Sequence, residues 1–169
     1  MPDSKQRIVI VLAMSCAVAH AEPETRFTGE GGAYIGVVNL GHGPIGTFDT
    51  ALGARLDERV DLVFGTRAAV FNSTGVDGWA TLDTSLHIFV APKIYVIAGV
   101  GLTLSASSHS GDSPLAGPAA GFEGTLGVGV RLIGSRYRGI DVRALGNVDT
   151  NIHSYPTLLS GSIGLAFVF

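Results

Sequence analysis

From residue 32 onward, apolar residues recur at every second position in segments of about ten residues. A period of two predicts β-strands, because successive side chains of a strand point to opposite faces of the sheet. In the last segment, Leu165, Phe167 and Phe169 share one face, and small residues such as Gly164 and Ala166 share the other. The eight expected strands cover residues 32–40, 46–56, 60–70, 80–90, 94–104, 120–132, 139–146 and 159–169.

The two faces of these segments differ in a consistent way. In segment 60–70, Leu62 and Phe64 lie on the apolar face. Arg67 lies on the other face, which consists of small residues with isolated charged residues among them. The same division holds for segment 46–56 and for every segment after 60–70, whereas the inward face of the first segment, 32–40, is ambiguous. A face of small residues with isolated charges fits a crowded barrel interior, so the apolar face is expected to point outward.

Composition supports a membrane barrel. The mean hydropathy is +0.39. Only 15% of the residues are charged, against about 25% in ordinary soluble domains. After the first twenty residues, no apolar run reaches the roughly 18 residues that a membrane helix needs. Lys93 is the only lysine after residue 21. The solvated exterior of a soluble protein normally carries many lysines, so this scarcity disfavours a soluble β-protein. The net charge of −3 offers no basic surface, so nucleic acid is not an expected partner.

The connections between the expected strands alternate in length. Membrane barrels keep short turns on the periplasmic side and longer loops on the outside. An even number of strands also places both chain ends on one side. We therefore expect an all-β fold: a closed antiparallel eight-stranded transmembrane β-barrel that spans residues 22–169. The short connections are 57–59, 91–93 and 133–138, and the longer ones are 41–45, 71–78, 105–118 and 147–156.

The first 21 residues predict a cleavable secretory signal peptide. Lys5 and Arg7 form a positive start, residues 8–18 form a short apolar stretch, and Ala19-His20-Ala21 is an A-x-A cleavage site. An alternative is a first buried helix, which the polar residues directly after Ala21 disfavour. The chain is thus divided into a signal peptide, 1–21, and one barrel domain.

Cys16 is the single cysteine and lies inside the apolar stretch. A lipoprotein signal is the alternative interpretation, but Ala13 stands where such a signal usually has leucine. Cleavage after Ala21 would leave the mature chain without a cysteine, and so without disulfide or thiol chemistry.

The C-terminal alternation resembles the β-signal of Gram-negative outer-membrane barrels, in which alternate apolar positions and a terminal aromatic are read by the insertion machinery. The residues that carry this resemblance are Ile163, Leu165, Phe167 and Phe169. Across nearly the whole mature chain, the architecture resembles the transmembrane part of outer membrane protein A and the OmpX-like proteins. The resemblance implies a monomer in the cell outer membrane. It also implies roles in membrane integrity, adhesion or resistance to host defences, although the short loops disfavour extensive adhesion. Implied partners are outer-membrane lipid, lipopolysaccharide, the insertion machinery and periplasmic chaperones.

Charges of both signs lie on the inward faces of neighbouring strands. Buried charges are tolerated only when paired, so we expect an interior network of salt bridges and hydrogen bonds. Eight strands leave an interior barely wide enough for side chains, which disfavours the alternative of a narrow pore lined by these charges. The expected interior residues are Asp49, Arg55, Asp61, Arg67, Asp83, His87, Glu123, Arg131, Asp141 and Arg143.

Candidate catalytic groups are few. Asp83, Ser85 and His87 share one inward face, but positions two apart on a strand lie about 6.5–7 Å apart, too far for a nucleophile and its base. Histidines in three expected loops, His42, His109 and His153, offer no ligand spacing for a metal, although lipid A-modifying barrels do use histidine and serine near the outer face. Neither a cofactor nor a metal is expected.

These observations favour a small outer-membrane barrel with a structural or surface-interaction role and no catalysis. The alternatives are a lipid A-modifying enzyme of the deacylase or acyltransferase type, a narrow pore, and a soluble periplasmic barrel that binds a ligand.

Overall fold

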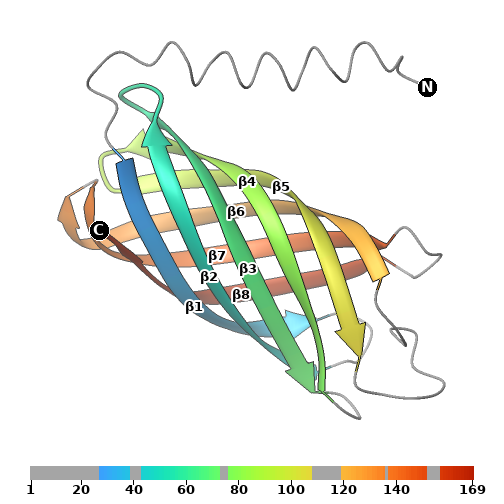
Figure 1. The fold of residues 1–169 in the computed structure, drawn as a ribbon. Coiled ribbons are helices and arrows are strands. Elements are labelled where there is room, and N and C mark those ends of the chain that lie inside the picture. The colour runs from blue at the N-terminus through green and yellow to red at the C-terminus, as the bar shows by residue number, and fades with distance from the viewer. Residues whose placement is uncertain (1–26, 39–42, 73–75, 108–118, 136, 152–156) are drawn as a thin grey trace, which may run out of the picture.

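The computed structural model describes residues 27–38, 43–72, 76–107, 119–135, 137–151 and 157–169. In these residues eight antiparallel strands close into one barrel, in chain order (Figure 1). No helix among them is long and apolar enough to cross a membrane. The strands are β1 (Phe27–Val38), β2 (Gly43–Arg55), β3 (Val60–Asn72), β4 (Val76–Ala91), β5 (Ile94–Ser107), β6 (Ala119–Ser135), β7 (Arg138–Asn151) and β8 (Leu158–Val168).

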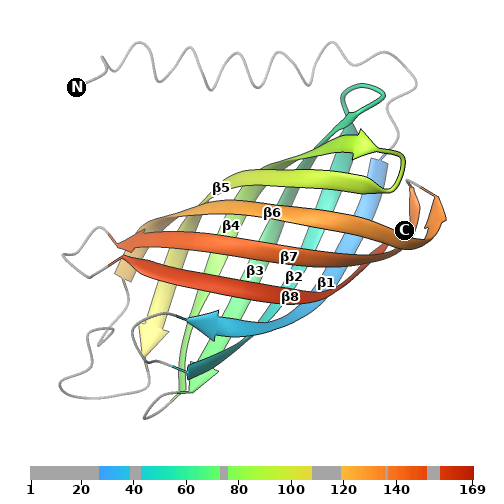
Figure 2. The same ribbon diagram turned by 180° about the vertical axis from the view of Figure 1, so that it is seen from behind.

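The closed antiparallel barrel expected from the sequence is confirmed. β1 pairs with β8 along a register that joins Glu30 to Val168 and Val38 to Ser160, which leaves no free edge among the eight strands. Because the strands alternate in direction, one end of the barrel holds three turns: β2–β3, β4–β5 and β6–β7. The start of β1 and the chain end lie there too (Figure 2). We call this the turn end, and the opposite end the loop end.

Several expected strand boundaries are wrong. β1 begins at Phe27 instead of residue 32, and β7 continues to Asn151, past the expected end at 146. Polar residues such as Asp149 suggest a loop, but the inward face of a barrel accepts polar side chains, so the backbone ladder continues wherever a neighbouring strand offers partners. The connections 41–45, 71–78, 105–118, 133–138 and 147–156 are accordingly shorter than expected.

The two faces of the wall are divided as the alternation predicted, with the apolar side outward. Ile35 is 74% exposed and Leu126 is 68% exposed, whereas Tyr95 and Asp141 are 0% exposed inside the barrel. The structure also assigns the faces of β1: Ile35 points outward and Tyr34 inward. A charged interior within an apolar exterior is the reverse of the arrangement in a soluble protein.

Two groups of apolar side chains fill parts of the interior. Toward the loop end, Val38, Ile45, Ala69 and Trp79 form a buried cluster against which Leu158 packs. Toward the turn end, a second cluster surrounds Tyr95 and consists of Tyr34, Phe89, Tyr95, Ile97 and Leu145. Polar networks occupy the space around these clusters and are described below.

The β6–β7 hairpin has an irregular end. The register between β6 and β7 shifts between Arg131 and Ile133, and Gly134 has a φ of 97°, a backbone conformation that residues with a side chain rarely adopt. The shift leaves Leu132 and Ile133 both exposed at the turn end. In Figure 2 this hairpin lies beside the chain end.

The expected signal peptide, 1–21, with Cys16, lies outside the described residues, as do His42, His109 and His153.

Candidate functional site

Arg67 on β3 is the centre of a polar cluster in the interior, which we call the Arg67 cluster. Its Nη1 donates to Glu123 Oε1 at 2.5 Å and to Asn147 Oδ1 at 3.0 Å, and its Nη2 donates to Asp83 Oδ2 at 3.1 Å. Asp83 belongs to the neighbouring β4, but Glu123 and Asn147 belong to β6 and β7, across the lumen. One guanidinium therefore ties opposite walls of the barrel together.

Hydroxyl groups complete the Arg67 cluster. Thr81 Oγ1 donates to Glu123 Oε2 at 3.0 Å, and Thr125 Oγ1 donates to Glu123 Oε1 at 2.9 Å. Asn147 Nδ2 donates to Ser160 Oγ at 3.3 Å, and Thr103 Oγ1 donates to Asp149 Oδ1 at 3.2 Å. The threonine hydroxyls supply donors to both carboxylate oxygens of Glu123 and to one of Asp149. A buried carboxylate oxygen without a donor is costly in a low-dielectric interior.

Arg143 on β7 is the centre of a second cluster nearer the turn end, the Arg143 cluster. Its Nη2 donates to Glu30 Oε2 at 2.6 Å, and its Nε donates to the hydroxyl of Tyr95 at 2.6 Å. The Tyr95 hydroxyl in turn donates to Asp141 Oδ2 at 2.6 Å. Asp141 also accepts hydrogen bonds from Arg131 Nε and, at 3.1 Å, from Arg131 Nη2. Two arginines thus meet two carboxylates, so the charges of this cluster balance.

The Asp83-Ser85-His87 sequence does not assemble a catalytic triad. Asp83 is directed to Arg67, whereas His87 Nδ1 lies 3.7 Å from Glu30 Oε1. The His87 ring stacks on Tyr95 with 5.1 Å between the ring centroids. Asp83 and His87 therefore serve two different clusters, and His87 is packed as part of the interior.

The remaining sequence-predicted residues lie at the margins of the clusters. Asp49 on β2 lies directly opposite Arg67 in the strand register, and Asp61 on β3 lies between Arg55 and His87 on its two neighbouring strands. Arg55 lies outside both clusters, at the mouth of the turn end. Its Nε donates to the Asp57 carbonyl oxygen at 2.8 Å, and its Nη1 donates to the hydroxyl of Tyr137.

A small cavity separates the two clusters. Its volume is about 20 Å³, which is enough for one water molecule. Arg67 and Asp83 line it from one cluster, and Glu30, His87 and Arg143 line it from the other. The space between the two clusters is therefore far smaller than a channel.

Sequence reasoning missed several members of the clusters. Glu30 was outside the expected first strand, although the alternation of Thr28, Glu30 and Gly32 could have extended that strand backward. Asn147 and Asp149 were assigned to a loop, although they continue the inward set of Asp141 and Arg143 by steps of two. Extending each alternation until it failed would have found these residues.

The two clusters differ from a metal-binding site. Within the described part of the chain, no group of three or more His, Cys, Asp or Glu side chains is placed to hold a metal ion. Each charged group of the two clusters is directed to an opposite charge or to a hydroxyl, an arrangement typical of structural networks.

Comparisons with known proteins agree on the fold. No protein-family model and no curated protein match the chain. The N-terminal β-barrel domain of Pseudomonas aeruginosa OprF is similar with a TM-score of 0.57 and 15% identity, over 86% of this chain and 100% of that chain. Neisserial surface protein A has a TM-score of 0.56 and 11% identity, over 84% of this chain and 94% of its own. The attachment invasion locus protein Ail of Yersinia pestis has a TM-score of 0.55 and 10% identity, over 85% of this chain and 98% of its own.

At these identities the likeness concerns the fold, which the chain shares from β1 to β8. The chain therefore has the closed eight-stranded fold of the small outer-membrane β-barrels.

Proposed function

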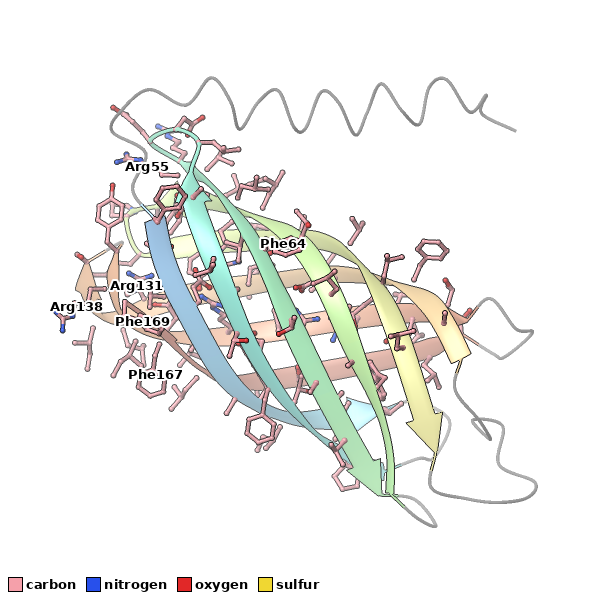
Figure 3. The ribbon with its side chains drawn as sticks, in the orientation of Figure 1. Arg55, Phe64, Arg131, Arg138, Phe167 and Phe169 are labelled. Carbon is pink, nitrogen blue, oxygen red and sulfur yellow. The ribbon has the colours of Figure 1, made fainter. Side chains whose placement is uncertain are left out.

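We propose that the protein is an integral barrel of the bacterial outer membrane, with a structural or surface-interaction role and neither catalysis nor conduction. The observation that carries the proposal is the reversed wall. Exposed aliphatic and aromatic side chains cover the outside, as Figure 3 shows for Phe64 and Phe167, while the interior holds the charges. Such a surface would aggregate in water, but it is favourable in a bilayer. The closed sheet of the eight described strands also leaves no free strand edge there.

The absence of conduction rests on how the interior is filled. The loop-end apolar cluster around Trp79, the Arg67 cluster and the Arg143 cluster follow one another along the lumen. Arg67 reaches Asn147 on the opposite wall, and Arg143 reaches Glu30 two strands away. Ions would therefore have to break salt bridges to pass. A structural barrel is therefore favoured over the narrow pore.

The remaining parts of the proposal follow from the sequence. Residues 1–21 would act as a cleaved export signal. In the membrane, the monomeric barrel would contact lipid and lipopolysaccharide, after delivery by periplasmic chaperones and the insertion machinery. The mass of the purified mature protein tests the first of these statements, since cleavage after Ala21 sets its N-terminus at Glu22.

The location can be tested with isolated outer membranes. A closed barrel resists SDS until it is boiled, because its backbone is fully paired, so the unboiled protein should migrate at a different position on a gel. Recovery in the soluble periplasmic fraction, with no shift on boiling, would support the soluble ligand-binding barrel instead.

Two further measurements separate the functional alternatives. Planar-bilayer recording of the purified protein should show no steady conductance, and ion-selective steps would establish the pore. Expression should leave the mass of lipid A unchanged. A mass change that corresponds to a lost or gained acyl chain would establish the lipid A-modifying enzyme.

A further inference from the structure

The exposed basic side chains of the described residues lie together at the turn end. Arg59 is in the β2–β3 turn, Lys93 in the β4–β5 turn and Arg138 at the start of β7, and all three are exposed. Figure 3 shows Arg138 and Arg55 at the end of the barrel where Phe167 and Phe169 lie. Each of the three hairpin ends therefore presents one exposed cation at the same rim of the barrel.

The rest of the molecule makes this distribution one-sided. Apart from Arg55, the other arginines of the described residues, Arg67, Arg131 and Arg143, are buried in the lumen and paired with carboxylates. In the sequence, the loop-end connections 39–42, 73–75, 108–118 and 152–156 contain neither lysine nor arginine. Among the described residues, the exposed cations therefore lie at the turn end, where the acidic Asp57 and Glu58 are exposed as well.

The backbone at these cations is held in place. The carbonyl oxygen of Arg59 accepts a hydrogen bond from Phe89 N at 2.7 Å, and that of Lys93 accepts one from Arg131 N at 2.8 Å. In the strand register, Arg138 pairs with Ser135. The three positions are therefore fixed relative to the barrel wall and are not on long mobile arms.

Apolar side chains lie beside each cation. Leu56 precedes the turn of Arg59, Ile94 directly follows Lys93, and Ile133 lies on the hairpin of Arg138; all three are exposed. An apolar belt that ends in exposed cations matches the boundary between acyl chains and lipid headgroups.

The acidic Asp57 lies in the same turn as Arg59. Its Oδ1 accepts hydrogen bonds from the backbone amides of Arg59 and Val60 at 2.5 and 2.9 Å.

We propose that the turn end binds the headgroups of anionic phospholipids, with Arg59, Lys93 and Arg138 as the phosphate-contacting residues. Arginine and lysine are the side chains that pair best with phosphate, and basic residues next to a bilayer are attracted to anionic lipids. The inference rests on the proposed function, because it requires that the barrel spans a bilayer.

The lipid preference can be measured by electron paramagnetic resonance in phosphatidylcholine vesicles that contain the folded barrel. Trace spin-labelled phosphatidylglycerol or phosphatidylcholine reports the share of each lipid that is immobilised at the protein. The natural protein should bind the phosphatidylglycerol label about two to five times more strongly than the phosphatidylcholine label. The preference should fall toward unity in about 1 M NaCl, where the screening length is only about 3 Å.

The variants identify the responsible residues. A triple variant, Arg59→Gln, Lys93→Gln and Arg138→Gln, should lose the preference, and each single change should lower it by part of that amount. Glu58→Gln is the matched control, because it removes an exposed negative charge from the same end and should keep or increase the preference.

The outcomes separate the inference from the proposed function. A heat-modifiable barrel that shows no preference for phosphatidylglycerol, or a triple variant that keeps it, overturns the inference and leaves the membrane barrel intact. A protein that fails to insert in phosphatidylcholine vesicles overturns both. If the triple variant does not fold, the three single variants provide the same comparison.

Discussion

Phe169 closes the barrel seam against Gly29. The amide of Gly29 donates to the carbonyl oxygen of Phe169 at 2.7 Å, and the amide of Phe169 donates to the carbonyl oxygen of Gly29 at 2.9 Å. The Phe169 ring covers Gly29 so closely that a Cβ at residue 29 would collide with ring atom Cε2. The last aromatic residue therefore fits a space that only glycine leaves open.

Gly29→Ala should weaken this seam. The added methyl group must push the Phe169 ring away, and we expect a loss of about 1–3 kcal/mol in the free energy of unfolding. Urea titration of the barrel in lipid vesicles measures it. Gly161→Ala is the matched control on the partner strand, since nothing lies within 4 Å of a Cβ there. Equal effects at both positions would contradict the close fit.

Replacing Phe167 and Phe169 with serine should block assembly while export continues. Phe167 on the seam strand β8 and Phe169 directly after that strand are both exposed, and both belong to the alternation that resembles an insertion signal. The protein should accumulate in the periplasm without the heat-dependent gel shift. Normal amounts of heat-modifiable barrel in the outer membrane would show that neither ring is required.

Val100→Arg should cost about 2–4 kcal/mol of unfolding free energy, because Val100 is exposed near the middle of β5, where the bilayer midplane is expected. Val100→Leu keeps the site apolar and should be nearly neutral. The inward change Thr125→Ser, which keeps the hydroxyl, should also be much milder than the arginine. Refolding titrations into vesicles rank the three, and a harmless arginine would refute the assignment of this face to lipid.

Arg67→Ala should lower stability by about 3–5 kcal/mol, because it leaves Glu123 and Asp83 buried without their cation. The double variant Arg67→Ala with Glu123→Gln should recover part of the loss, since it removes one of the unpaired charges. Denaturation in vesicles gives both values. A double variant that is less stable than Arg67→Ala would show that the ion pair is not the main term.

Asp149→Asn should stabilise the barrel. Asp149 and Glu123 lie directly opposite each other on β7 and β6, and like charges in such pairs repel, so removing one should raise the unfolding free energy by about 0.5–1 kcal/mol. An asparagine oxygen can still accept the hydrogen bond from Thr103.

Asp141→Asn is the matched control for that prediction. It lies on the same strand and also points inward, but its carboxylate faces Arg131 and Arg143, so its loss should cost about 3–5 kcal/mol. Opposite signs for the two variants, measured by urea unfolding, would support the two clusters as they are described. The same sign for both would contradict their different charge balance.

Much of the fold could be predicted from the sequence alone. The period of two assigns residues such as Leu126 and Tyr95 to opposite faces, and glycine-rich inward positions with isolated charges indicate which face is the interior. This information is local, because the pleat of a strand alone decides which side chains share a face. The number of strands and most of the inward charges follow from it.

The partners of those charges were decided only by the tertiary structure. Arg67 reaches Glu123, 56 positions along the chain, and Arg143 reaches Glu30, 113 positions away. The closure of the barrel and the relative shift of its strands set which inward residues meet across the lumen, and neither is encoded in the alternation of a single strand. The alternation of single strands can be extended to Glu30 and Asp149, but only the closed sheet supplies the paired neighbouring strands that place these two residues in the interior.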